Sequence, residues 1–156
     1  MYKKHSAISV LFPLLVIGFL GPVSILVCQD LDRTDPLAVA NYALMLVRVG
    51  DVDGMLGIMD KDQKKAYVPF TPDKREEMQN AVKEYSEKIG KVTQVSEIRE
   101  LTTLSGKPGV AAKIGKKSGE VVVIVLSKED NIYYYDDFLT LTSKAYKQLK
   151  LIKKAK

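Results

Sequence analysis

The residues of this sequence that could bind a small molecule or transfer a proton are tyrosines and carboxylates. A carboxyl group held in an apolar pocket can act as an acid or a base. The candidates for lining such a pocket are Tyr42, Tyr67, Tyr85, Tyr134 and Asp136. A tyrosine at helical or strand spacing is usually a core residue with its hydroxyl at the surface. The pattern therefore predicts a ligand pocket and assigns no catalytic residue.

Histidine, cysteine and tryptophan are nearly absent from the chain. Its 156 residues include one histidine, His5, one cysteine, Cys28, and no tryptophan. Both residues lie in the N-terminal leader, so the rest of the chain cannot use Ser-His-Asp or Cys-His catalysis. Only carboxylates remain as zinc ligands, and no glycine-rich phosphate loop is present. We therefore expect no metal and no cofactor.

The stretch Asp51-Val52-Asp53-Gly54 invites comparison with a calcium-binding loop. An EF-hand loop needs an oxygen ligand at position 5, glycine at position 6 and glutamate at position 12. Counted from Asp51, these positions hold Met55, Leu56 and Asp62. The two aspartates of the stretch are better explained as caps of a helix.

The N-terminal segment has the pattern of a targeting leader. Lys3 and Lys4 precede the uncharged run 7–27, which is the layout of a secretory signal. The run is close to the length that spans a bilayer, whereas Gly21-Pro22 would interrupt a helix. The residues before Cys28 are similar to a bacterial lipobox, except that Val27 stands where a small residue is required. A lipid-modified Cys28, a cleaved signal and an uncleaved anchor all remain open, and each exports the rest of the chain.

The net charge of +5 is produced at the two ends of the chain. The segment 29–142 holds 16 basic and 19 acidic residues, which argues against a nucleic-acid-binding surface. The last 14 residues combine six lysines with Tyr146, Leu149 and Ile152 at three-residue steps. This tail is typical either of a frayed helix packed on the domain or of a contact with an anionic surface. Such a contact would use Lys144, Lys147, Lys150, Lys153 and Lys154.

Three helices are expected before any strand. Thr34-Asp35-Pro36 and Thr71-Pro72-Asp73 each place a capping residue before a proline, so helices begin at 36 and 72. The helix that begins at 36 ends at Gly50, and the helix that begins at 72 ends at Gly90. A shorter helix opens at Asp51, and the charged segment 61–65 is expected to be solvated.

After Gly90 the pattern is that of strands. We expect strands within 92–104, 110–116, 121–126 and 132–141, joined by short turns in an antiparallel meander. The class is α+β, with about three N-terminal helices packed on a curved antiparallel sheet of about four strands. The chain divides into a leader (1–28), a linker (29–34), one domain (35–142) and the basic tail (143–156).

This order of elements resembles the NTF2-like (cystatin-like cone) superfamily, above all its small exported or lipoprotein members of unknown function. The resemblance rests on the turn Val49-Gly50-Asp51-Val52 and on the hairpin Glu129-Asp130-Asn131-Ile132-Tyr133-Tyr134-Tyr135-Asp136-Asp137-Phe138, where tyrosine replaces the family's tryptophan. It covers about residues 35–142. It implies a cone-shaped domain, a fold that hosts enzymes, binding modules and assembly scaffolds alike.

The function expected from these observations is a non-enzymatic binding or interaction module. It is exported, tethered to a membrane through its N-terminal segment, and a candidate homo-oligomer. The alternatives are an isomerase or hydratase that uses a buried carboxylate with tyrosine, as members of the superfamily do, and a scaffold subunit of an envelope assembly behind an uncleaved membrane helix.

Overall fold

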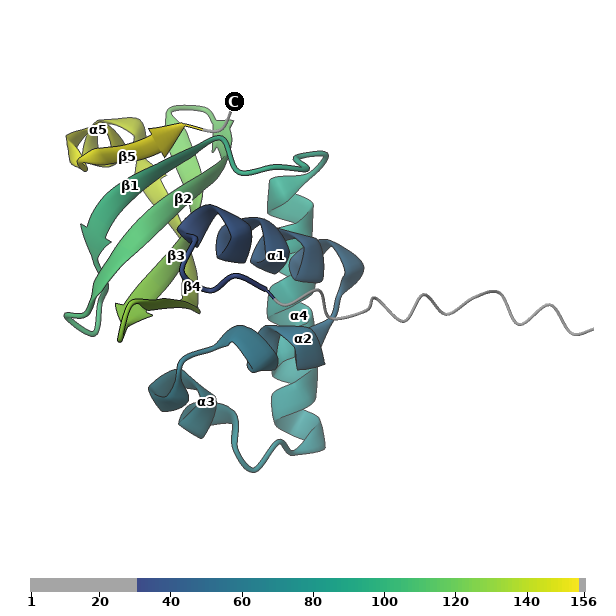
Figure 1. Cartoon of the computed structure of the whole chain (residues 1–156). Coiled ribbons are helices and arrows are strands. Elements are labelled where there is room, and N and C mark those ends of the chain that lie inside the picture. Colours follow the sequence, from purple (N-terminus) through teal and green to yellow (C-terminus); the bar gives the residue numbers. More distant parts are fainter. Residues whose placement is uncertain (1–30, 155–156) are drawn as a thin grey trace, which may run out of the picture.

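Helices pack against one antiparallel sheet in the computed structural model, which describes residues 31–154 (Figure 1). The helices are α1 (Pro36–Val49), α2 (Val52–Ile58), α3 (Lys61–Tyr67), α4 (Pro72–Ile89) and α5 (Ser143–Gln148). The strands are β1 (Glu97–Thr102), β2 (Pro108–Lys117), β3 (Glu120–Glu129), β4 (Ile132–Thr142) and β5 (Leu151–Lys154). The α+β class is confirmed, and β1 to β4 pair in chain order as a meander.

The predicted helix starts are formed by side chains that satisfy free backbone donors. Asp35 accepts a hydrogen bond from the N–H of Leu37 at 3.0 Å, and Thr71 accepts one from the N–H of Lys74. Proline follows each cap because the first helical residue needs no N–H donor. Gly50 ends α1 with a φ of 72°, a left-handed conformation that glycine adopts without steric cost.

The charged segment that was expected to be solvated forms α3, so four helices precede the sheet and not three. No side chain of α3 is fully buried. Its sequence therefore lacks the apolar periodicity that indicates the other helices. The helix begins because Asp60 accepts a hydrogen bond from the N–H of Gln63 at 2.8 Å. Gln63 and Tyr67 belong to this helix.

The sheet has five strands and not four, because the basic tail adds β5 at its edge in the order β4-β3-β2-β1-β5. The tail first forms α5, whose Tyr146 is buried, and then pairs antiparallel with β1. The N–H of Glu100 donates to the carbonyl of Lys150 at 2.8 Å. The pairing gives the outer edge of β1 a partner, which a frayed helix would not do.

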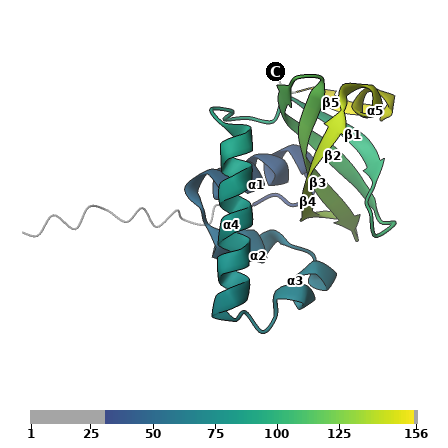
Figure 2. The ribbon, with the colours of Figure 1, turned by 180° about the vertical axis from the view of Figure 1, so that it is seen from behind.

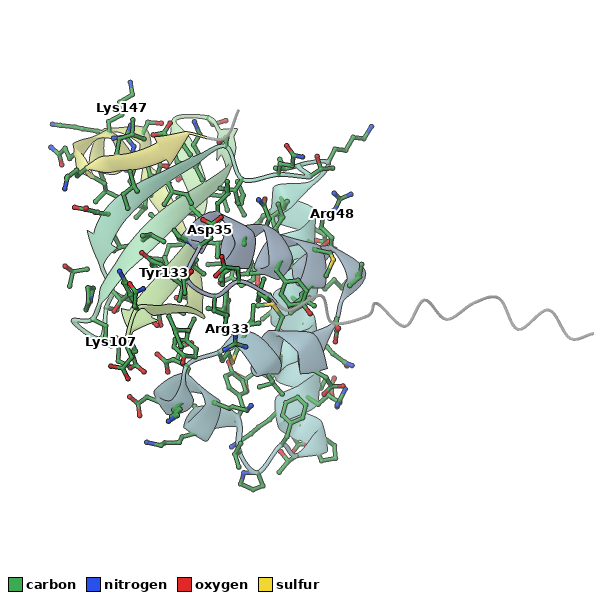
Figure 3. All side chains as sticks on the ribbon, in the orientation of Figure 1. Arg33, Asp35, Arg48, Lys107, Tyr133 and Lys147 are labelled. Carbon is green, nitrogen blue, oxygen red and sulfur yellow. The ribbon has the colours of Figure 1, made fainter. Side chains whose placement is uncertain are left out.

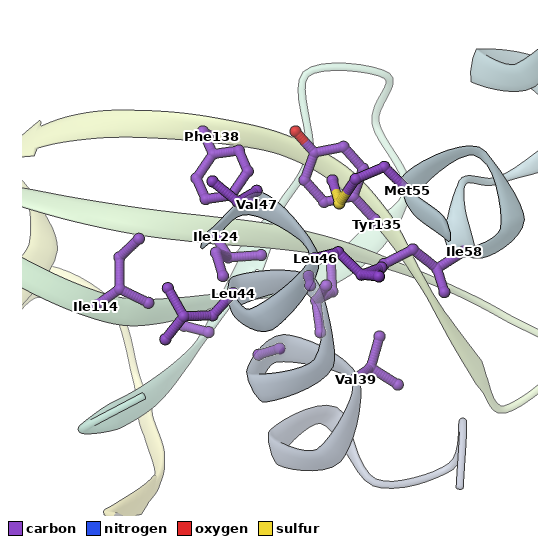
Figure 4. Close-up of a cluster of buried hydrophobic side chains, with 14 of the residues drawn as sticks. Val39, Leu44, Leu46, Val47, Met55, Ile58, Ile114, Ile124, Tyr135 and Phe138 are labelled. Carbon is purple, nitrogen blue, oxygen red and sulfur yellow. The ribbon is translucent and has the colours of Figure 1, made fainter. Parts of the chain in front are cut away.

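Both faces of the sheet are covered by apolar packing. Helix α1 lies across β2, β3 and β4, and α4 packs against α1 and α2 (Figures 1 and 2). Figure 4 shows the larger core between these helices and the sheet, with Leu44, Leu46 and Ile124 at its centre. A smaller cluster on the opposite face places Tyr146 of α5 against Val123 and Val125. The predicted continuous apolar strand 121–126 is therefore buried on both sides.

Candidate ligand pocket

A pocket of about 370 Å³ lies between α2, α3 and α4 and the middle of β4, and we call it the tyrosine pocket. Its wall is mainly apolar and aromatic, with three polar side chains from α3 and β4. The lining residues are Met55, Met59, Gln63, Ala66, Tyr67, Met78, Ala81, Val82, Tyr85, Tyr135, Asp136, Asp137 and Phe138.

Two adjacent aspartates of this wall, Asp136 and Asp137, lie at an irregularity in β4. Leu126 of β3 pairs with Tyr135, but its neighbour Val125 pairs with Asp137, so Asp136 is an extra residue in the register. A bulge of this kind changes which face the following side chains occupy. Tyr135 and Phe138, three residues apart, both join the helix-side core as a result.

Asp137 is the carboxylate most closely surrounded by tyrosines. Its Oδ1 accepts a hydrogen bond from the N–H of Phe138 at 2.7 Å. Burial raises the pKa of Asp137, and this backbone hydrogen bond opposes the shift. Burial also raises the pKa values of Tyr67, Tyr85 and Tyr135, and the negative charge of Asp137 raises each of them further. The phenol groups near Asp137 are therefore kept protonated.

Asp136 is held by Gln63 of α3. The side-chain amide N–H of Gln63 donates to both the carbonyl oxygen and the carboxylate of Asp136. Burial raises the pKa of Asp136, and the negative charges of Asp60 and Asp137 raise it further. The other amide atom of Gln63, its Oε1, is buried and has no hydrogen-bond partner within residues 31–154.

The aromatic part of the wall is fixed by stacking. The rings of Tyr85 and Phe138 lie 4.5 Å apart, and the Tyr85 hydroxyl donates to the Phe138 carbonyl at 3.3 Å. Tyr135 is only 6% exposed, and its ring lies 5.5 Å from that of Phe138. Offset and tilted ring pairs of this kind are favourable, so β4 and α4 present a preformed aromatic surface.

A cluster of charges at the end of the sheet holds α3 in place. Lys107, on the turn between β1 and β2, lies 3.1 Å from Asp60, 3.2 Å from Asp62 and 2.5 Å from Glu129. The hydrogen bond with Glu129 and those with the two aspartates raise the pKa of Lys107, although its burial opposes this. Figure 3 shows Lys107 at this corner of the molecule, far from Lys147 on α5. A second cavity of about 280 Å³ adjoins the cluster and shares Gln63, Asp136 and Asp137 with the tyrosine pocket.

Three of the five residues predicted to line a pocket meet in this one. Tyr67, Tyr85 and Asp136 line it, from α3, α4 and β4. Tyr42 does not: it is a half-buried residue of α1 that packs against the core. Tyr134 does not either, and its ring lies 5.4 Å from the guanidinium of Arg33.

Asp137, Tyr135 and Gln63 line the pocket but were not predicted from the sequence. Regular alternation from the predicted residues Tyr134 and Asp136 places Tyr135 and Asp137 on the opposite face, whereas both aspartates line the pocket, next to the register shift in β4. The signal that could have indicated it is the pair Asp136-Asp137, which interrupts an otherwise apolar strand before Phe138. Gln63 gave no such signal because α3 was not expected.

The lysines of the tail differ in their surroundings. Lys144 and Lys147 are exposed on α5, whereas Lys150 forms an ion pair with Glu100 at 3.0 Å. The side chains of Lys153 and Lys154 lie outside the described part of the structure, as do Cys28 and the whole leader. Within residues 31–154, no helix is both long and apolar enough to cross a membrane, and no three acidic, histidine or cysteine residues gather as metal ligands.

Comparisons with known proteins identify no relative. No family model matches the chain, and no curated protein or solved structure matches it either.

Proposed function

We propose that this chain is an exported, membrane-tethered binding module that holds a small apolar molecule in the tyrosine pocket. The observation that carries the proposal is the pocket itself. Small-molecule sites are usually concave, about 300–1,000 Å³ in volume, and apolar with a few placed polar groups. The tyrosine pocket has this volume, three methionines and three tyrosines in its wall, and Gln63, Asp136 and Asp137 as its polar groups.

Two further parts of the proposal rest on the sequence. The leader supports export, with Cys28 as a candidate site for a lipid anchor. The order of helices and strands and the two short motifs support an NTF2-like cone, in which the pocket between helices and sheet would be the interior of the cone. The exposed lysines of α5 would then contact the anionic surface of the same membrane.

Methionine methyl groups provide a direct test of binding. Met55, Met59 and Met78 line the pocket, whereas Met45 of α1 packs against the core elsewhere. We expect 2-phenylethanol, added to the full chain in mild detergent, to shift the ¹³C-methyl signals of the three lining methionines and to leave Met45 unchanged. Equal shifts of all four signals, or none, would contradict the proposal.

A blocked pocket is the matched control for this titration. Ala81 is an exposed residue of α4 that lines the pocket, and the neighbouring Asn80 is exposed but does not line it. Ala81→Phe should therefore abolish the three methionine shifts, whereas Asn80→Phe should preserve them. Neither substitution removes a buried side chain, so both variants are expected to fold.

The fate of the leader is tested by intact mass. The chain recovered from the membrane fraction should begin at Cys28 and carry an added lipid mass that Cys28→Ser abolishes. An unmodified full-length chain in both samples would identify an uncleaved anchor and favour a scaffold subunit. A shorter chain without lipid would identify a released domain, and the tether would then be wrong.

A second candidate function is favoured by the surroundings of Asp137. A carboxyl group whose pKa is raised by burial, next to tyrosine hydroxyls, is an arrangement that can take up and return a proton. The domain would then be an isomerase or hydratase acting on the same small apolar ligand. The two functions separate on one observation, because an enzyme converts its bound ligand and a binding module releases it unchanged.

A further inference from the structure

We infer that the ligand of the tyrosine pocket is an organic cation, an ammonium group on an apolar body, with Asp137 and Asp136 as its counter-ions. This rests on the proposed function and names the chemical class of the ligand. The charge of the pocket wall and the unpartnered oxygen of Asp137 lead to it, and the apolar wall suits the body of the ligand.

The charge in the pocket wall is of one sign. Apart from the tyrosines, the titratable residues that line it are Asp136 and Asp137, and none of its lining residues is basic. Two lysines near the pocket already have partners. Lys107 binds Asp60, Asp62 and Glu129, and Lys88, which lies over the outer face of Tyr85, is paired with Glu84. An anionic ligand would therefore meet uncompensated repulsion, and a cation would be attracted.

One carboxylate oxygen of the pocket wall is an acceptor without a donor among residues 31–154. The Oε1 of Gln63 also lacks a partner within the described residues, but it has essentially no accessible surface, so a ligand in the pocket would not reach it. Asp137 accepts one backbone hydrogen bond through Oδ1, and its second oxygen has no partner in the described part of the chain. An ammonium group carries up to three N–H donors and would satisfy the second oxygen of Asp137.

The remaining wall suits the body of such a ligand. Tyrosine rings attract cations through their faces, and this attraction strengthens where water is excluded. Tyr67 supplies such a ring, whereas Tyr85 is covered by Phe138 and Lys88, and Tyr135 is only 6% exposed. The methionines supply an adaptable apolar surface. An aliphatic or aromatic group therefore fits beside the charged head.

The inference predicts how affinity depends on pH. Asp137 is faced by Tyr67, Tyr85, Tyr135 and Asp136, and Asp136 is also influenced by Asp60 and Lys107. Both aspartates have a pKa raised by burial, and a bound cation stabilises their charged forms. Affinity for a cation should accordingly fall as the solution is acidified through these pKa values, while affinity for a neutral ligand stays constant.

Three probes of one shape and different charge test the inference. We would titrate phenethylammonium, 2-phenylethanol and 3-phenylpropanoate into the full chain in mild nonionic detergent and follow the methyl signals of Met55, Met59 and Met78. The ammonium ion should bind at least about tenfold more tightly than the alcohol, as expected for hydrogen bonds to charged groups. The carboxylate should not bind measurably.

Variants assign the effect to the pocket carboxylates. Asp137→Asn should weaken ammonium binding by about tenfold or more and weaken alcohol binding by much less. Asp136→Asn should act in the same direction, which guards against a fold defect in either variant. Glu87→Gln removes the same charge from an exposed position of α4 outside the pocket and should change neither affinity.

The outcomes separate this inference from the proposed function. Alcohol binding as tight as ammonium binding, or no loss in either aspartate variant, overturns the cationic ligand and leaves the pocket as a binding site. If no probe shifts the three methionine signals at millimolar concentration, the proposed function fails together with the inference.

Discussion

Replacement of Lys107 by methionine is expected to lower the free energy of unfolding by about 2–3 kcal/mol. Lys107 is the only cation that contacts Asp60 among the described residues, and Asp60 is 2% exposed. Methionine keeps the apolar stem but leaves that carboxylate buried without a counter-ion. Breaking a fully buried pair costs about 3–5 kcal/mol. The loss expected here is smaller, about 2–3 kcal/mol, because the Lys107 side chain is 22% exposed and water screens its charge.

The matched control is Lys65→Met, measured by chemical denaturation of the full chain in mild detergent. Lys65 also pairs with an aspartate, Asp62, at 2.9 Å, but its side chain is 76% exposed. Its loss should leave the unfolding midpoint almost unchanged. Equal effects of the two substitutions would show that the cluster around Lys107 does not stabilise α3.

The Lys107 effect should also depend on pH in a defined direction. Burial alone would raise the pKa of Asp60, but hydrogen bonds from the Gln63 N–H and from Lys107 hold it below its ordinary value of 3.8. A carboxylate with a lowered pKa stabilises the folded state above the unfolded pKa, and this contribution disappears as pH falls through the folded pKa. The difference between the parent chain and Lys107→Met should therefore be full at neutral pH and shrink below about pH 3.8.

Loss of the ion pairs of Lys107 should also disturb the part of the tyrosine pocket wall that α3 forms. The cluster anchors the start of α3, and α3 carries Gln63 and Tyr67 into the pocket wall.

The double variant Asp60→Asn with Lys107→Met should recover part of the lost stability, because replacing both members of a buried pair is often nearly neutral.

What the sequence predicts well are the elements whose signals are local. The starts of α1 and α4 follow from a capping side chain and a proline next to each other, and the strands follow from a change of period after Gly90. These features need no knowledge of distant residues. The same is true of the buried strand β3, because its continuous apolar run indicates a strand covered on both faces.

The parts that escaped prediction depend on residues far apart in the sequence. Helix α3 buries no side chain fully and is held by Lys107, 40 or more residues away along the chain. Strand β5 has the exposed side chains Leu151 and Ile152, so its pairing with β1 defines it more than its own pattern does. Asp137 lies beside the register shift between β3 and β4, which depends on how the two strands pair. The sequence thus predicts that tyrosines and carboxylates line a pocket, but not which residues complete its wall.

Gly109→Ala is expected to lower the free energy of unfolding by about 3–5 kcal/mol, the range of exceptional single substitutions. A Cβ atom at Gly109 would lie 2.2 Å from the carbonyl oxygen of Leu126 and 3.0 Å from Cγ2 of Thr103. Neither neighbour can move freely, because Leu126 is a fully buried residue of β3 and Thr103 is 5% exposed. Relief of the clash would require separating β2 from β3, the pair that carries the centre of the sheet.

The same substitution at Gly57 provides a control of opposite sign. Gly57 lies in α2, and a Cβ atom there would meet nothing within 4 Å. Alanine should raise the stability by about 0.5–1 kcal/mol at that position, because glycine loses more backbone entropy in a helix. Urea unfolding of both variants beside the parent chain measures the difference. A cost at Gly109 below about 1 kcal/mol, well under the exceptional range, would mean that β2 and β3 do not approach each other as closely at this end as the structure has them.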